Sequence, residues 1–143
     1  MAVSQSNDAI PCVGGIVFDE RPTGRRILLV RRGREPAKGT WSVPGGRVEA
    51  GESHEAATAR EVLEETGLEV LVGRLVGTVE RDAPGGRVYV IHDHECRLAP
   101  GAEADAVRAG DDAVDAAWFT PDELRTLDCA PGLVETLTGW GVL

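Results

Sequence analysis

Short apolar runs separated by turn-forming residues predict a domain that contains several β-strands. We expect strands in five segments: residues 13–18, 27–31, 68–79, 87–98 and 116–119. The second segment contains an unbroken Ile-Leu-Leu-Val run, which is typical of a strand buried on both faces. Arg-Pro-Thr-Gly within residues 19–26 and Asp-Ala-Pro-Gly-Gly at residues 82–86 predict the turns that return the chain.

The clearest helical pattern covers residues 53–66. Ser53 suits the N-cap of this helix, and Gly67 suits the position just after its end, where a left-handed backbone is common. A short second helix is expected after Thr120, because Thr120 suits an N-cap and Glu123 completes a capping box.

Strands and helices are mixed along the chain without strict alternation, which predicts an α/β fold with a sheet sandwiched by helices. A final helix is expected at residues 131–140. The length of 143 residues predicts one domain, residues 10–143, after a flexible tail formed by residues 1–9. Residues 33–51 form a long, glycine-rich loop, and loops of this length in compact domains are usually functional.

The composition is acidic, with 24 Asp and Glu against 15 Lys and Arg and a net charge of -9. This charge disfavours binding to nucleic acid or to an anionic membrane, and by itself would also repel phosphorylated metabolites. The N-terminus lacks a signal peptide pattern, and no apolar run approaches the roughly 20 residues of a membrane span. Cys12, Cys96 and Cys129 form no paired motif, so we expect core or half-buried thiols in a reducing cytoplasm.

Three carboxylates gather on one edge of the helix predicted at residues 53–66. Glu61, Glu64 and Glu65 have the i, i+3 and i+4 spacing of neighbours on a helix, away from the apolar stripe. Their repulsion destabilises a helix by a few tenths of a kcal/mol per pair, and the helix dipole disfavours anions near the C-terminus. The pattern is typical either of a solvated acidic face or of a site for a hard cation.

The residues around these acids distinguish between the two alternatives. From Gly46 the chain reads GRVEAGESHEAATAREVLEETGL, which resembles the signature motif of the Nudix hydrolases. Every specified position of that motif is filled: Gly46, Glu52, Arg60, Glu61, Val62, Glu64, Glu65, Gly67 and Leu68. Flanking segments, Trp-Ser-Val-Pro-Gly-Gly before and Trp-Phe-Thr-Pro-Asp-Glu-Leu after, extend the resemblance over most of the chain. It implies a Nudix-type α-β-α sandwich with a mixed central β-sheet.

The resemblance also implies a role for each motif residue. The expected ligands of Mg²⁺ or Mn²⁺ are the carbonyl of Gly45 and the side chains of Glu61, Glu64 and Glu65. Structural roles are implied for four residues: Gly46, Glu52, Arg60 and Gly67. In this group, Gly46 allows the backbone to pass close to the metal, and an ion pair between Glu52 and Arg60 holds the loop to the helix.

The implied reaction is the hydrolysis of a nucleoside diphosphate linked to another group, without a covalent nucleophile. Divalent ions orient the attacking water and lower its pKa, and a carboxylate accepts its proton. Glu61 or Glu64 is the expected catalytic base. Glu103 and Asp111, in the acidic loop of residues 99–112, are weaker alternatives for the same role or for a contact with the substrate.

Other side chains are candidates for substrate contacts. Arg81 and Arg87 flank the predicted turn and suit phosphate, while Trp41 and Tyr89 offer surfaces on which a base can stack. Pro84 falls sixteen residues after the motif, where some Nudix enzymes that act on ADP-ribose have a proline, although it also suits a simple hairpin turn. His92 and His94 face either the cleft or one side of the sheet.

ADP-ribose or a nucleotide sugar is therefore the favoured substrate, and a MutT-type nucleoside triphosphate pyrophosphohydrolase is the alternative. A non-catalytic ligand-sensing Nudix module and a metal-free acidic interaction domain rank lower, and the resemblance leaves a homodimer open. Seven of the 24 acids lie within residues 49–69, so bound divalent ions would reverse the local potential and admit a small phosphorylated nucleotide.

Overall fold

The computed structural model describes residues 8–110 and 112–143. The strands of this part are β1 (Ala9–Arg21), β2 (Gly24–Arg32), β3 (Trp41–Ser42), β4 (Gly45–Arg47), β5 (Val70–Asp82), β6 (Val88–Leu98) and β7 (Ala113–Phe119). The helices are α1 (His54–Thr66), α2 (Pro121–Thr126) and α3 (Leu133–Gly139), with 3₁₀ turns η1 (Pro84–Gly86) and η2 (Ala104–Ala106).

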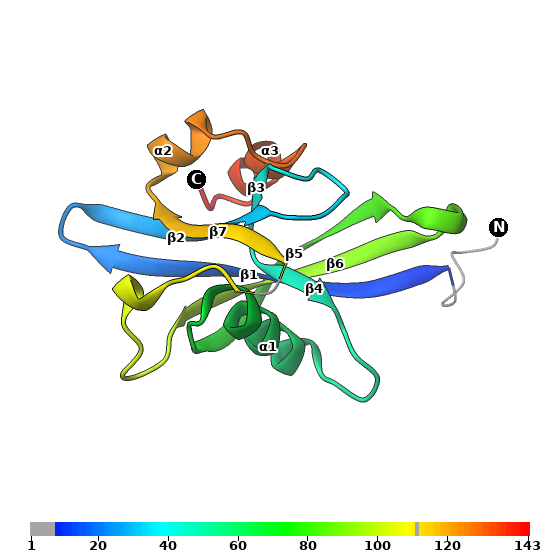
Figure 1. Cartoon of the computed structure of the whole chain (residues 1–143), viewed down its shortest axis with the longest axis horizontal. Coiled ribbons are helices and arrows are strands. Elements are labelled where there is room, and N and C mark those ends of the chain that lie inside the picture. Colours follow the sequence, from blue (N-terminus) through cyan, green and yellow to red (C-terminus); the bar gives the residue numbers. More distant parts are fainter. Residues whose placement is uncertain (1–7, 111) are drawn as a thin grey trace.

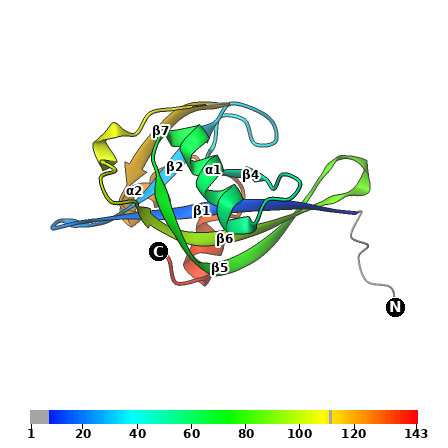
Figure 2. The same ribbon diagram turned by 90° about the horizontal axis from the view of Figure 1, so that it is seen from below.

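The described strands form one mixed sheet between helices, as the sequence predicted (Figure 1). The strand order is β3-β2-β1-β6-β5, with β4 also paired to β1 and β7 to β2. Strands β1 and β6 are parallel, whereas the other pairs are antiparallel. Helix α1 lies on one face of the sheet, and α2 and α3 lie on the other (Figures 1 and 2).

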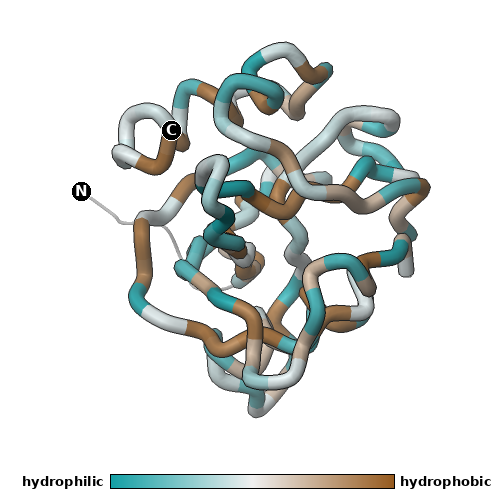
Figure 3. Tube along the Cα trace, turned by 90° about the vertical axis from the view of Figure 1, so that its left-hand side faces the viewer, coloured by the Kyte–Doolittle hydropathy of each residue, from teal (hydrophilic) through white to brown (hydrophobic). Residues whose placement is uncertain are grey.

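The core has two layers, one on each face of the sheet. Leu28 packs with Val17 and Val62 on the α1 side, whereas Ile27 and Leu29 pack on the opposite side, beneath α2 and α3. This alternation confirms the predicted burial of β2 on both faces, and Figure 3 shows apolar and polar segments alternating along the trace. Two of the cysteines are buried and the third is half-buried, also as expected. No helix in the described part of the chain is long and apolar enough to cross a membrane.

Helix ends follow the predicted local signals. Ser53 Oγ accepts a hydrogen bond from Ala56 N at 3.0 Å, and Gly67 ends α1 with a φ of 75°. Thr120 and Glu123 form the predicted capping box of α2. The predicted final helix is shorter than expected, because Gly132, at φ 83°, takes a left-handed conformation just before α3.

The strands extend further than the hydrophobic pattern indicated. The predicted turn at residues 19–26 is mostly strand, because ion pairs Asp19–Arg26 (2.7 Å) and Glu20–Arg25 (2.6 Å) join polar residues across the hairpin. Ala9, assigned to the tail, already pairs with Val88. Residues 1–7 of the predicted tail lie outside the described part of the chain.

The segment at residues 33–51, predicted as a long loop, also contains two short strands, β3 and β4. Strand β4 pairs with the N-terminal part of β1, and β2 pairs with the C-terminal part of the same edge. Between them, Gly15 N donates a hydrogen bond to Pro44 O at 2.9 Å. These backbone contacts fix the loop against the sheet, directly beside α1.

Candidate active site

Two glycines of β4 bring the backbone against the acidic edge of α1. Gly45 N donates a hydrogen bond to Glu65 Oε1 at 3.1 Å. A Cβ atom on Gly46 would collide with the carboxylate of Glu61, so only glycine fits there without displacing that side chain. The close approach places Glu61 and Glu65 next to the backbone of β4, as the motif led us to expect.

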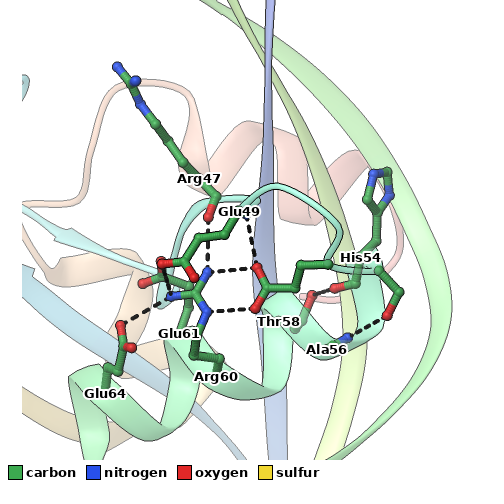
Figure 4. A network of polar contacts seen from close by, with 10 residues as sticks. Arg47, Glu49, His54, Ala56, Thr58, Arg60, Glu61 and Glu64 are labelled. Carbon is green, nitrogen blue, oxygen red and sulfur yellow. Dashed lines mark hydrogen bonds and ion pairs between the residues drawn. The ribbon is translucent and has the colours of Figure 1, made fainter.

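Arg60 connects the loop to the helix (Figure 4). Its guanidinium donates to both carboxylate oxygens of Glu52, at 2.7 and 3.0 Å, and to the carbonyl of Arg47 at 3.1 Å. The hydrogen bonds from Arg60 are the main cause that lowers the pKa of Glu52 to about 2, and the Glu49 N–H adds to this effect. This paired arrangement supports the structural role that the motif implies for Glu52 and Arg60.

The same guanidinium also contacts the helix carboxylates. Arg60 Nη1 lies 3.0 Å from Glu61 Oε2 and 3.2 Å from Glu64 Oε1. The Glu64 side chain is 42% exposed and the Glu61 side chain 14% exposed, so Glu64 lies at the outer edge of the site. Arg60 therefore reduces the repulsion among these acids, which the sequence argument did not include.

Glu65 is the carboxylate least favourable to ionise in the absence of a metal. Burial raises its pKa to about 8, against the lowering effect of the hydrogen bond from Gly45, and the charge of Glu61 raises it further. Burial also raises the pKa of Glu61, opposed by Arg60. A cation held between these two groups would favour their charged forms.

The residues present fit a hard divalent ion by their chemistry. Carboxylate oxygens and a backbone carbonyl are ligands that Mg²⁺ and Mn²⁺ accept, with water and phosphate oxygens completing the coordination. Within the described residues, no three His, Cys, Asp or Glu side chains already converge on one point as an ion site. A metal ion at this edge would therefore take further ligands from water and from the substrate.

A pocket of about 170 Å³ opens beside Glu65 and Gly45. Its wall includes three arginines: Arg31 and Arg32 at the end of β2, and Arg34 just after it. The charge of Arg32 acts on Glu65, and Arg34 forms an ion pair with Asp112 at 2.7 Å. None of these arginines was among the candidates from the sequence, and only Arg34 belongs to the glycine-rich loop of residues 33–51. Their charge suits a phosphate group at the edge of the acidic site.

Two of the proposed substrate contacts, Arg81 and Tyr89, share one face of the sheet. Arg81 of β5 and Tyr89 of β6 are paired in register, and the Arg47 guanidinium lies 5.8 Å from the centre of the Tyr89 ring. Arg87 is exposed and follows η1, the 3₁₀ turn that contains Pro84. The predicted hairpin turn is thus present at this end of the sheet, beside Arg81.

Trp41 does not join that surface. Its ring packs edge-on against Phe119, with ring centres 5.0 Å apart, and it belongs to the core beneath α2 and α3. This packing favours a structural role for Trp41 over base stacking.

The remaining candidates lie apart from the motif or beneath it. Glu103 is exposed and precedes η2, and Asp111 lies outside the described residues. His92 and His94 face α1, since His54 stacks on His92 with ring centres 4.5 Å apart and lies 6.5 Å from His94. Their arrangement supports a sheet-face role.

The fold, the acidic helix and the glycines of β4 define a Nudix domain, and the chain belongs to this family: the NUDIX domain model matches residues 9–137. The chain is 39% identical over 102 residues to an ADP-ribose pyrophosphatase of Methanocaldococcus jannaschii, covering 71% of this chain and 59% of the relative. It is 34% identical over 124 residues to "Putative 8-oxo-dGTP diphosphatase 2" of Mycobacterium tuberculosis, covering 81% of this chain and 84% of the relative.

Comparison with solved structures also finds Nudix proteins. A MutT NUDIX hydrolase from Burkholderia pseudomallei superimposes with a TM-score of 0.71 at 28% identity, covering 91% of this chain and 96% of that one. The chain spans less than two thirds of the length of several curated relatives that it matches.

Proposed function

We propose that this Nudix domain hydrolyses the pyrophosphate bond of a nucleoside diphosphate linked to another group, with ADP-ribose or a nucleotide sugar as the favoured substrate. The observation that carries this proposal is the approach of Gly45 and Gly46 to Glu65 and Glu61, with Arg60 holding the loop to the helix. Carboxylates held beside the backbone of β4 suit divalent ions, and such ions suit a pyrophosphate.

In the proposed mechanism, the Gly45 carbonyl and the side chains of Glu61, Glu64 and Glu65 would hold Mg²⁺ or Mn²⁺. When bound, the metal neutralises the pyrophosphate and lowers the pKa of the attacking water. Glu61 or Glu64 would accept the proton from that water, and Glu64, whose side chain is 42% exposed, has the freer access to solvent.

The Glu52–Arg60 pair contributes indirectly, by keeping the loop and α1 in register. Positively charged and aromatic side chains beside the acidic edge suit the phosphates and the base of a nucleotide. Arg32 lies close enough to influence Glu65 and suits a phosphate oxygen, while Arg47, Arg81 and Tyr89 share one sheet face that suits a phosphate and a base. The name of the Methanocaldococcus jannaschii relative favours ADP-ribose among nucleotide substrates.

A MutT-type activity on nucleoside triphosphates is the second candidate, favoured by the name of the Mycobacterium tuberculosis relative. Product analysis separates the two activities, since ADP-ribose yields AMP and ribose phosphate, whereas a triphosphate yields a nucleoside monophosphate and pyrophosphate. The non-catalytic sensing module ranks below both, because every motif carboxylate is in place.

The test is a panel assay with Mg²⁺ or Mn²⁺ and four substrate classes: ADP-ribose, NADH, dinucleoside polyphosphates and oxidised or normal nucleoside triphosphates. We expect metal-dependent turnover that is fastest with ADP-ribose or a nucleotide sugar. Faster turnover of triphosphates would replace the first candidate by the second, and absence of turnover in all classes, with retained nucleotide binding, would favour the sensing module.

A further inference from the structure

Asp93 of β6 is a buried carboxyl group that the proposed mechanism does not use. Its residue is only 6% exposed, and its Oδ1 has no hydrogen-bond partner among the described residues. A buried polar group without a partner is unfavourable, so its presence in a core calls for a reason. Burial raises the pKa of Asp93 to about 7, while the charge of Arg81 opposes that change.

The position of Asp93 in the sheet is as unusual as its burial. It pairs with Gly14 of β1 on one side and with Gly77 of β5 on the other, and Gly14 pairs in turn with Gly45 of β4. A row of four strands therefore carries a single side chain, that of Asp93. This row runs directly to Gly45, about 10 Å away at the usual spacing of neighbouring strands.

The two flanking glycines are needed by the side chains around Asp93. A Cβ on Gly14 would collide with Asp93 Oδ1 and would lie 3.2 Å from Val43 Cγ2. A Cβ on Gly77 would overlap the Trp140 indole. Val43 and the Trp140 ring therefore lie over the two glycines that flank Asp93, which leaves no room beside the carboxyl group for a group as large as an aromatic base.

Asp93 also lies on the side of the sheet that carries the proposed nucleotide surface. Its neighbours His92 and His94 face α1, so Asp93 faces the opposite side, together with Tyr89 four residues earlier on the same strand. Arg81, which pairs with Tyr89, is close enough to influence the charge of Asp93.

We propose that Asp93 accepts a hydrogen bond from a ribose hydroxyl of the nucleotide and thereby selects ribonucleotides over deoxyribonucleotides. This inference rests on the proposed pyrophosphatase function. With the phosphates at Gly45 and Glu65, as proposed, the ribose hydroxyls follow within a few bonds, and one of them would supply the donor that Asp93 lacks. An analogue without the hydroxyl leaves the buried carboxyl unpaired, and sites of this kind discriminate strongly against such analogues.

The experiment compares ADP-ribose with analogues that lack the 2′- or the 3′-hydroxyl of the adenosine ribose. The proteins are the wild type, Asp93→Ala and Asp93→Asn, and the matched control is Glu95→Gln, which alters a partly exposed carboxylate two residues further along β6. The readouts are kcat/KM with Mg²⁺ and the affinity for AMP and its two deoxy analogues by titration calorimetry, which requires no hydrolysis.

We expect the wild type and Glu95→Gln to prefer the ribose form at least about tenfold over one of the deoxy analogues. In Asp93→Ala this preference falls to about twofold or less, because turnover of ADP-ribose drops while that of the deoxy analogue is kept. Asp93→Asn keeps an acceptor oxygen and retains a reduced preference, and this variant decides the question should Asp93→Ala fail to fold.

A wild type that cleaves all three substrates equally well would overturn the role of Asp93 while leaving the pyrophosphatase proposal intact. The same holds if the Asp93 variants lose activity on all three substrates by one common factor, which indicates a structural role. A wild type that neither cleaves nor binds any nucleotide would overturn both proposals together.

Discussion

Replacement of Glu65 by glutamine tests the proposed metal site through two independent measurements. Glutamine has the shape of the native side chain and can still accept the hydrogen bond from Gly45 N, but it cannot carry a charge. We expect Mg²⁺-dependent hydrolysis to be abolished, because a ligand that carries charge to the metal is lost. We also expect the metal-free variant to be at least as stable as the metal-free wild type.

The second expectation follows from the pKa of Glu65, which burial raises from 4.5 to about 8. At pH 7 the unfolded chain has released this proton, whereas the folded chain retains it. This difference lowers the free energy of unfolding by about 3 kcal/mol. Partial exposure and relaxation of the site reduce this cost, so we expect glutamine to stabilise the metal-free protein by about 1–2 kcal/mol. For a domain of this size, that is a rise in Tm of roughly 3–8 °C.

The assay is thermal unfolding in a chelator between pH 5 and pH 8, beside activity with and without Mg²⁺. Because the pKa of Glu65 is higher in the folded protein than in the unfolded chain, the stability that its neutral form gives is present at low pH. It is lost as the pH increases from 4.5 through 8. The advantage of Glu65→Gln should therefore grow over this range, and Mg²⁺ should raise the Tm of the wild type only. Substantial activity in the variant, or a markedly lower metal-free Tm, would refute the reasoning.

Three further variants test other parts of the site. Glu52→Gln should lower the Tm at pH 7, because the hydrogen bonds from Arg60 hold the pKa of Glu52 at about 2. The difference in Tm between wild type and variant should shrink as the pH falls from 4.5 toward 2. A loss of Tm that is the same at every pH would contradict the ion-pair argument. Gly46→Ala should cost about 1–3 kcal/mol in urea unfolding and most of the activity, since its methyl group meets Glu61; unchanged activity would mean that this contact is not needed. Tyr89→Ala should raise KM for ADP-ribose about tenfold with little change in kcat, as expected for the loss of a stacking surface, and a change in kcat alone would exclude that role.

Features that depend on a few neighbouring residues were predictable from the sequence. Helix α1, its N-cap at Ser53 and its end at Gly67 were predicted correctly, because capping and helical periodicity involve residues within a few positions of one another. The spacing of Glu61, Glu64 and Glu65 predicted one acidic edge for the same reason, since an α-helix has a fixed rotation per residue. The family followed from this local pattern.

What surrounds the acidic edge depends on contacts between distant segments. Gly46 meets Glu61 only because β4 pairs with β1, and Arg32 reaches the neighbourhood of Glu65 only because β2 shares that edge. Strand β4 has three residues and no hydrophobic alternation, so its pairing is specified by backbone hydrogen bonds that the side-chain pattern does not reveal.

Asp93 shows most clearly the difference between what local sequence predicts and what contacts between strands decide. In the sequence it is one acid among 24, placed between two histidines in a strand. Its burial between Gly14 and Gly77 depends on the register of β6 with its hairpin partner β5 and with the distant strand β1, and a shift by one residue would turn Asp93 to the other face of the sheet. The sequence by itself therefore determined the helix, its carboxylates and the family. Only the tertiary structure, through strand register, decided which side chains stand beside them.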